Sequence, residues 1–149
     1  MSVTDEQMVW LRAYLSGDLE EARRVNAQAT APGAAAGLGA LVHAAFVLAA
    51  RRKFAPRWTR AEVIQFVARV RGLLSEGPDV LDPAVAEQEL RSAHGEKLTS
   101  RTDVRSRGRA QFILLNALVQ SLDLDDAEVA GLLDQARGLA DSLLGAGMA

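Results

Sequence analysis

The chain has 149 residues, of which 49% are hydrophobic and 24% are charged, and it contains no cysteine. A chain of this length can bury a hydrophobic core, and its composition excludes a largely disordered polymer. The lack of cysteine excludes disulfide bonds, thiol catalysis and thiolate zinc sites, and it fits a reducing compartment.

Charge is unevenly distributed along the chain, although the net charge is only −2. The net charge is −2 over residues 1–50, +5 over residues 51–110 and −5 over residues 111–149. The basic middle and the acidic end are the main electrostatic signal of the sequence. Arginine outnumbers lysine fifteen to two, which is typical of a GC-rich genome such as that of an actinobacterium.

The N-terminal part predicts two consecutive helices. Thr4 to Gln7 has the spacing of a capping box, so we expect the first helix to begin there and to end at Gly17. A short second helix follows, with Ser16 or Asp18 as its cap. An acidic N-terminus that starts a helix differs from a secretory signal, and we therefore expect the protein in the cytoplasm.

The third predicted helix runs from about residue 36 to residue 53 and is apolar nearly all round. Such a helix is expected at the centre of a core. The uncharged run over residues 34–50 is short for a bilayer, so we expect no contact with a membrane.

Two further helices are predicted by their caps. Thr59 to Glu62 has capping-box spacing and opens the fourth helix. Asp82 followed by Pro83 opens the fifth, which is expected to end at Gly95. The segment over residues 96–107 has almost no apolar content, and we predict a mobile basic loop there.

The C-terminal part predicts two long helices. The sixth is expected from about Arg109 to Leu122, and the seventh follows a cap at Asp125 and carries an apolar stripe from Val129 to Leu144. No segment alternates with a period of two. We therefore predict a single all-α domain over residues 1–149, a compact orthogonal bundle of six to seven helices without a β-sheet.

Two basic clusters are the candidate binding sites for a partner or an anion. The first surrounds the turn after the third helix and contains Arg51, Arg52, Lys53 and Arg57. The second contains Arg101, Arg105 and Arg109, which recur every four residues and would share one stripe of a helix. Cations at a helix N-terminus cost about 0.3–1 kcal/mol each, so this cluster indicates either a loop or an anionic partner. The alternative interpretation is that these arginines pair with the protein's own acids.

Catalytic and cofactor sites are not predicted. His43 lies in an apolar run and His94 precedes a helix end, and neither has the partners that a catalytic or metal site needs. The glycines form no nucleotide-binding loop after a strand. We therefore expect no enzymatic activity, no cofactor and no metal.

The function that we expect is that of a small regulatory or adaptor protein that contacts an unknown protein partner. A homodimer is also expected, with the seventh helix supplying an interface through Leu132, Leu139 and Leu143. The alternative is a nucleic-acid-binding protein that uses residues 51–60 and 97–109, although the negative net charge counts against it. A third hypothesis is a small-molecule sensor with a pocket between the third, fourth and sixth helices.

Overall fold

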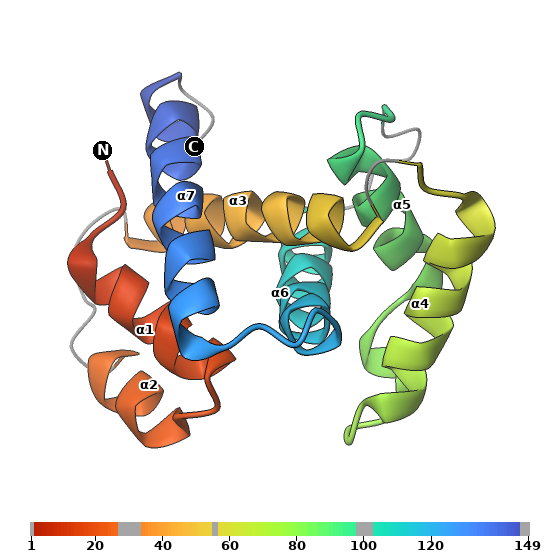
Figure 1. Ribbon diagram of the computed structural model, residues 1–149, viewed down its shortest axis with the longest axis horizontal. Helices are drawn as coiled ribbons and strands as arrows, with labels where there is room; N and C mark the ends of the chain where they lie inside the picture. The colour runs from red at the N-terminus through yellow and green to blue at the C-terminus, as the bar shows by residue number, and fades with distance from the viewer. Residues whose placement is uncertain (1, 27–33, 55–56, 98–102, 147–149) are drawn as a thin grey trace. The chain divides into compact units, whose positions relative to one another are not determined.

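The computed structural model describes residues 2–26, 34–54, 57–97 and 103–146. Over these residues the protein is all-α and contains no β-strand, which confirms the predicted fold class (Figure 1). Its elements in chain order are α1 (Asp5–Leu15), α2 (Leu19–Asn26), α3 (Ala34–Phe54), α4 (Arg60–Leu73), the 3-10 turn η1 (Pro78–Val80), α5 (Pro83–Ala93), α6 (Val104–Ser121) and α7 (Asp126–Gly145).

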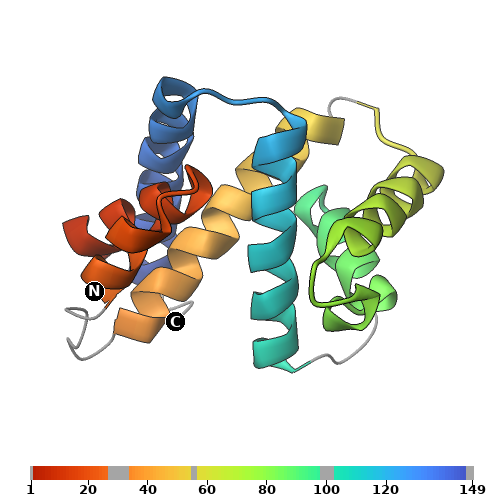
Figure 2. The same ribbon diagram turned by 90° about the horizontal axis from the view of Figure 1, so that it is seen from below.

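The chain divides into two compact units, which are described separately. Unit 1 comprises residues 1–45 and 123–149 and holds α1, α2, the first half of α3 and α7. Unit 2 comprises residues 46–122 and holds the second half of α3, α4, η1, α5 and α6. Figure 2 shows α3 as one unbroken helix, so a single element contributes to both units.

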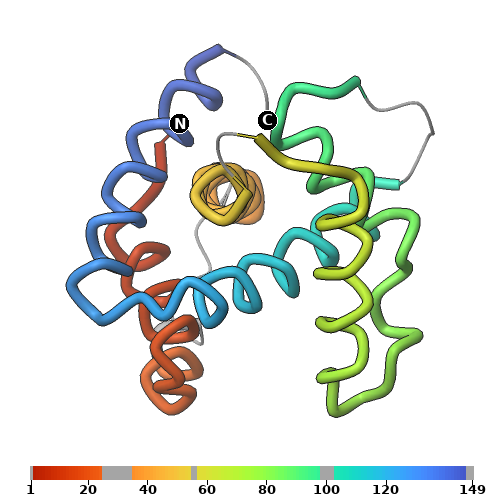
Figure 3. Tube along the Cα trace, turned by 45° about the vertical axis from the view of Figure 1, so that its right-hand side comes forward, coloured from red at the N-terminus to blue at the C-terminus, as the bar shows by residue number. Residues whose placement is uncertain are grey.

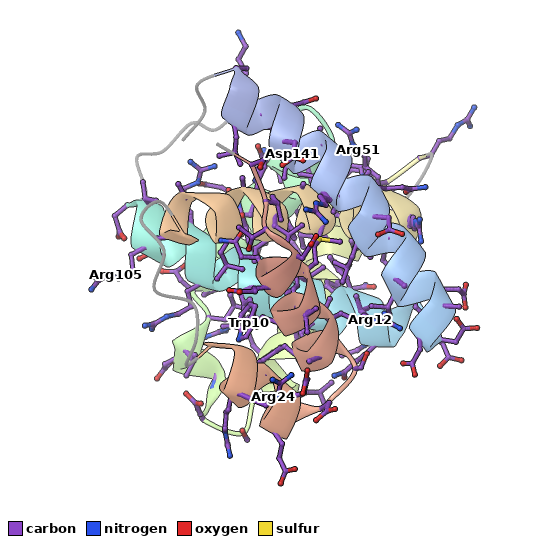
Figure 4. The ribbon with its side chains drawn as sticks, turned by 90° about the vertical axis from the view of Figure 1, so that its left-hand side faces the viewer. Trp10, Arg12, Arg24, Arg51, Arg105 and Asp141 are labelled. Carbon is purple, nitrogen blue, oxygen red and sulfur yellow. The ribbon has the colours of Figure 1, made fainter. Side chains whose placement is uncertain are left out.

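In unit 1, α1 packs against both α2 and α7. The N-terminal segment is fastened to α7 by polar contacts: the Val3 amide donates to Asp141 Oδ1 at 2.7 Å, and Arg137 donates to Val3 O at 2.9 Å and to Asp5 Oδ1 at 2.7 Å. Asp141, labelled on α7 in Figure 4, therefore has a structural role.

A glycine lets α3 approach α1 closely. A Cβ built on Gly37 would lie 2.9 Å from Gln7 Oε1, a distance that real side chains do not tolerate. Gln7 is only 6% exposed, and its Oε1 accepts the Thr4 amide as part of the capping box of α1. The absence of a side chain at Gly37 is therefore required by the packing of unit 1.

In unit 2, α4 packs on α5, and α5 packs on α6. The link between α4 and α5 is held by Arg71, whose Nε donates to Pro78 O at 3.1 Å and to Leu81 O at 2.9 Å. The core includes the fully buried Val67 and Leu115, as the helical periodicity predicts.

Most of the predicted helix boundaries are confirmed. Thr4, Thr59, Asp82 and Asp125 all cap helices with their side chains, and Gly17 and Gly95 follow helix ends with φ of 83° and 95°. The positive φ explains why glycine occupies both helix ends, because other side chains are strained in that region.

The prediction for the start of α6 was wrong. The helix begins at Val104 rather than near Arg109, because the Asp103 side chain accepts the Ser106 amide and acts as an N-cap. The predicted mobile basic loop over residues 96–107 is therefore helical from Val104 onward, and residues 98–102 lie outside the described part of the chain.

By length and composition, α3 could cross a membrane: residues 35–54 have a mean hydropathy of 1.2. Figure 3 looks along this helix. Of its hydrophobic window, 44% is nevertheless buried inside the protein. Leu41, Ala44 and Ala45 are fully buried in the first half, and Phe46, Ala49 and Ala50 in the second. These burials are typical of a core helix.

Candidate functional site

Unit 2 contains an open groove of about 480 Å³ between η1, the beginning of α5 and the beginning of α6. Its floor is partly apolar and its rim carries charges of both signs. The residues that line it are Asp79, Val80, Leu81, Asp82, Val85, Asp103, Arg105, Ser106, Arg109 and Ala110.

The acidic residues of the groove include the caps of two helices. Asp82 Oδ1 accepts the amides of Ala84 at 2.8 Å and Val85 at 3.3 Å. Asp103 accepts the amide and the hydroxyl of Ser106, both at 2.8 Å. Hydrogen bonding from Ser106 lowers the pKa of the Asp103 carboxyl below its ordinary value. Both carboxylates thus already have donors within the protein.

The basic side of the groove is formed by Arg105 and Arg109. Because α6 begins at Val104, these two arginines lie one helical turn apart on the same helix, as their four-residue spacing predicts. Both are exposed, and neither guanidinium has a hydrogen bond or an ion pair with any residue that the structure describes. Figure 4 shows the Arg105 side chain extending away from the ribbon.

The arginine between them behaves differently. Arg107 Nε donates to Glu89 Oε1 at 3.1 Å, and Gln111 Nε2 donates to the same oxygen at 2.8 Å. Glu89 is only 3% exposed, so its carboxylate is compensated by these contacts from α6. This network fixes the first turns of α6 against α5. It could not be predicted from the sequence, because nothing near Glu89 in the chain distinguishes it from a surface glutamate.

The described residues bear on one of the two interpretations of the basic segment, which is that its arginines pair with the protein's own acids. Arg107 pairs with an acid of the protein itself, whereas Arg105 and Arg109 do not. Arg101, the third member of the predicted stripe, lies outside the described residues.

The first basic cluster has a partly structural role. Arg51 Nε donates to Ala93 O at 2.9 Å and so caps the C-terminal end of α5, and Arg52 also has an interaction partner. Lys53 is half-buried and Arg57 is exposed. This cluster lies at the end of α3, where the helix dipole favours cations, so its charge needs no ligand to explain it.

Neither histidine belongs to a catalytic arrangement in the described residues. His94 Nδ1 lies 2.9 Å from Leu90 O, and its ring lies 5.3 Å from that of Trp58. Its Nε2 is buried without a hydrogen-bond partner. His43 is half-buried and has an interaction partner. Within the described ranges, no group of three His, Asp or Glu side chains is placed to hold a metal ion.

The three leucines predicted to form a homodimer interface differ in exposure. Leu132 is fully buried within the chain, so its side chain offers no surface to a second copy. Leu139 and Leu143 are half-buried on α7. Gly131 and Gly138, near the same stripe, are exposed, with open space where a Cβ would lie. Any surface that α7 offers a second copy therefore excludes Leu132.

Comparison with known proteins does not assign the chain to a class. No family model matches it, and no curated protein and no solved structure is similar to it. The chemistry of the groove is therefore the basis for a functional assignment.

Proposed function

We propose that this protein is a small regulatory or adaptor protein that acts through protein–protein contacts, and that its groove in unit 2 binds an acidic segment of another polypeptide. The observation that carries the proposal is the pair Arg105 and Arg109. Both line the groove, and neither is paired with a residue in the described part of the chain.

The position of these arginines supports an external anion. Arg105 lies in the first turn of α6, where the helix dipole repels cations, and Arg109 lies one turn later. The aspartates that line the same groove form no ion pair with either arginine. A carboxylate placed between them would accept charge-assisted hydrogen bonds, which contribute more than neutral ones.

The mixture of charges in the groove favours a polypeptide over a nucleic acid. A phosphate backbone is uniformly negative, and in this groove it would meet Asp79, Asp82 and Asp103 as well as the arginines. A polypeptide can place its carboxylates at the arginines alone, with amides near the aspartates and apolar side chains near Val80 and Val85. The groove also differs from the pocket expected for a small-molecule sensor, since η1 and α5 line it in place of α3 and α4.

The test is a titration of the isotope-labelled protein followed by amide chemical shifts. Three probes are used: a ten-residue peptide that alternates aspartate and leucine, the same peptide with asparagine, and a single-stranded DNA of ten nucleotides. We expect the aspartate peptide to shift the amides of residues 79–85 and 103–110, and the asparagine peptide to bind much more weakly.

The variant R105Q/R109Q should weaken binding of the aspartate peptide by about tenfold or more, because hydrogen bonds to charged groups contribute about 1.5–3 kcal/mol. The matched control is R69Q, which alters an exposed arginine of α4 that has no ion pair among the described residues. Binding of DNA in preference to the peptide, with a steep dependence on salt, would favour the nucleic-acid alternative. A lack of shifts in the groove with every probe, at a protein concentration where the chain is monomeric, would refute the proposal.

A further inference from the structure

Both ends of α6 carry charges that oppose the dipole of the helix. At its N-terminal end, where negative charge is favourable, stand Arg105 and Arg109 without internal partners. At its C-terminal end, where positive charge is favourable, the chain continues into Asp123. The N-cap Asp103 suits the dipole of α6, and Asp125 and Asp126 suit the N-terminus of α7 that follows. The charges without such an explanation are those of Arg105, Arg109 and Asp123.

Asp123 is also conformationally unusual. It follows the C-cap residue Leu122 and has φ of 53°, and it is the one non-glycine residue in the described part of the chain with a positive φ. Glycine or asparagine commonly occupies this position after a helix. Aspartate tolerates this conformation better than most side chains, but its negative charge is unfavourable at the C-terminal end of a helix. The helix dipole therefore does not explain the charge at this position.

The acidic corner, as we name residues 123–128, presents free carboxylates. Asp125 and Glu128 are engaged in the capping box of α7. Asp123 and Asp126 are exposed and form no hydrogen bond or ion pair through their side chains with any residue that the structure describes. The corner thus offers two unpaired carboxylates on either side of the half-buried Leu124.

We infer that the acidic corner of one copy of this chain occupies the groove of a second copy. The inference rests on the proposed function of the groove and names its partner. Two free carboxylates match two free guanidinium groups, and Leu124 provides an apolar side chain for the half-buried Val80 and Val85 of the groove. The same pairing would neutralise the charges of Arg105 and Asp123, which the dipole of α6 opposes.

The acidic corner cannot bind in the groove of its own chain. Figure 2 shows α6 as one continuous helix, and the sixteen-residue step from Arg105 to Ser121 corresponds to roughly 24 Å at 1.5 Å per residue. Asp123 follows directly at the far end. An acidic corner seated in the groove therefore comes from another molecule, and in a two-fold dimer each copy would supply its corner to the other.

The test is the molar mass in solution, measured by light scattering after gel filtration at low and at moderate salt. The wild-type protein should elute with twice the mass of one 15.9 kDa chain, and the dimer should weaken as salt screens the charge pairs. The groove variant R105Q/R109Q and the corner variant D123N/D126N should each be monomeric. Asparagine suits the positive φ of residue 123, so the corner variant is expected to keep its fold.

An equimolar mixture of the two variants provides the decisive result. The corner variant still has an intact groove, and the groove variant still has an intact corner. One of the two contacts can therefore form, and a heterodimer weaker than the wild-type dimer is expected. The matched controls R69Q and D134N alter exposed residues outside the groove and the corner, and both should remain dimeric.

The outcomes separate this inference from the proposed function. A wild-type monomer that still binds the aspartate peptide in its groove overturns self-association and leaves the proposed function intact. A dimer that persists in both double variants also overturns the inference, because the contact then lies elsewhere. A monomer that binds no acidic peptide overturns both.

Discussion

At the start of α6, the Asp103 carboxylate accepts hydrogen bonds from the amide and the hydroxyl of Ser106, and these bonds lower the pKa of its carboxyl. The ionised form therefore stabilises the folded protein at pH values above the ordinary pKa of aspartate, about 3.9. As the pH falls through the lower pKa of the folded state, this contribution is lost.

We predict that the variant D103N, which keeps a capping side chain but loses the charge, melts at a lower temperature than the wild type at pH 7. The two melting temperatures should converge as the pH is lowered through the depressed pKa of the folded state, where the wild-type carboxyl is protonated as well. Thermal unfolding followed by circular dichroism between pH 2 and 7 measures this. A difference that stays constant over the whole range would contradict the assigned role of the charge.

A second prediction at the residue scale concerns the buried carboxylate of Glu89. In the variant R107M, Glu89 keeps only the hydrogen bond from Gln111, and we expect a loss of about 1–3 kcal/mol in the free energy of unfolding. The double variant E89Q/R107M should recover part of this loss, because a neutral amide at position 89 can still pair with Gln111. Urea denaturation measures both, with R105M as a control of small effect. Equal stability of R107M and the wild type would show that the ion pair is unimportant.

At the scale of the elements, two glycines of α3 should respond in opposite ways to the same substitution. G37A places a methyl group 2.9 Å from Gln7 Oε1 in a buried and hydrogen-bonded position, so we expect destabilisation. G39A places the methyl group in open space on a helix, where alanine is favoured over glycine by about 0.8–1.0 kcal/mol. Urea denaturation midpoints of the two variants should therefore move in opposite directions. A stabilised G37A would mean that α1 and α3 are not closely packed at this point.

Helix boundaries were predictable where the signal is local. The caps at Thr4, Thr59, Asp82 and Asp125 depend on residues within one turn, so the sequence alone places them correctly. The start of α6 was missed because apolar periodicity begins late in this helix. Its first turns are instead held by the Asp103 cap and by the pairing of Arg107 with Glu89, a residue eighteen positions away.

The candidate site was predictable only in part, for the same reason. The four-residue spacing of Arg105 and Arg109 is visible in the sequence and correctly indicates a shared face of a helix. The groove itself combines residues 79–85 with residues 103–110, which only the packing of α5 on α6 brings together. Likewise, nothing in the adjacent sequence distinguishes Arg107, which pairs with Glu89, from Arg105 and Arg109.

At the scale of the whole molecule, we predict that the two units unfold together, as the single domain expected from the sequence. The reason is that α3 is one continuous helix whose Ala44 is buried in unit 1 and whose Phe46 is buried in unit 2. Loss of either half would remove hydrogen bonds from the other. Each unit has its own tryptophan, Trp10 in unit 1 and Trp58 in unit 2, so the variants W58F and W10F report on the units separately.

For each variant, urea denaturation is followed both by fluorescence and by circular dichroism. The fluorescence midpoint should coincide with the circular-dichroism midpoint of the same variant. Two separated transitions within one variant would show that the units are independent and that α3 breaks between them.

The order of the units along the chain has a consequence for biosynthesis. Unit 2 is one uninterrupted stretch, residues 46–122, whereas unit 1 needs both the segment before it and α7 after it. As the polypeptide leaves the ribosome, α1 and α2 emerge first, yet α7, which packs on α1, is translated after every other helix that the structure describes. Domains commonly fold in the order in which they are made. Here that order is reversed. The nascent chain can fold unit 2 first, whereas α1 and α2 keep apolar side chains exposed until α7 has been synthesised.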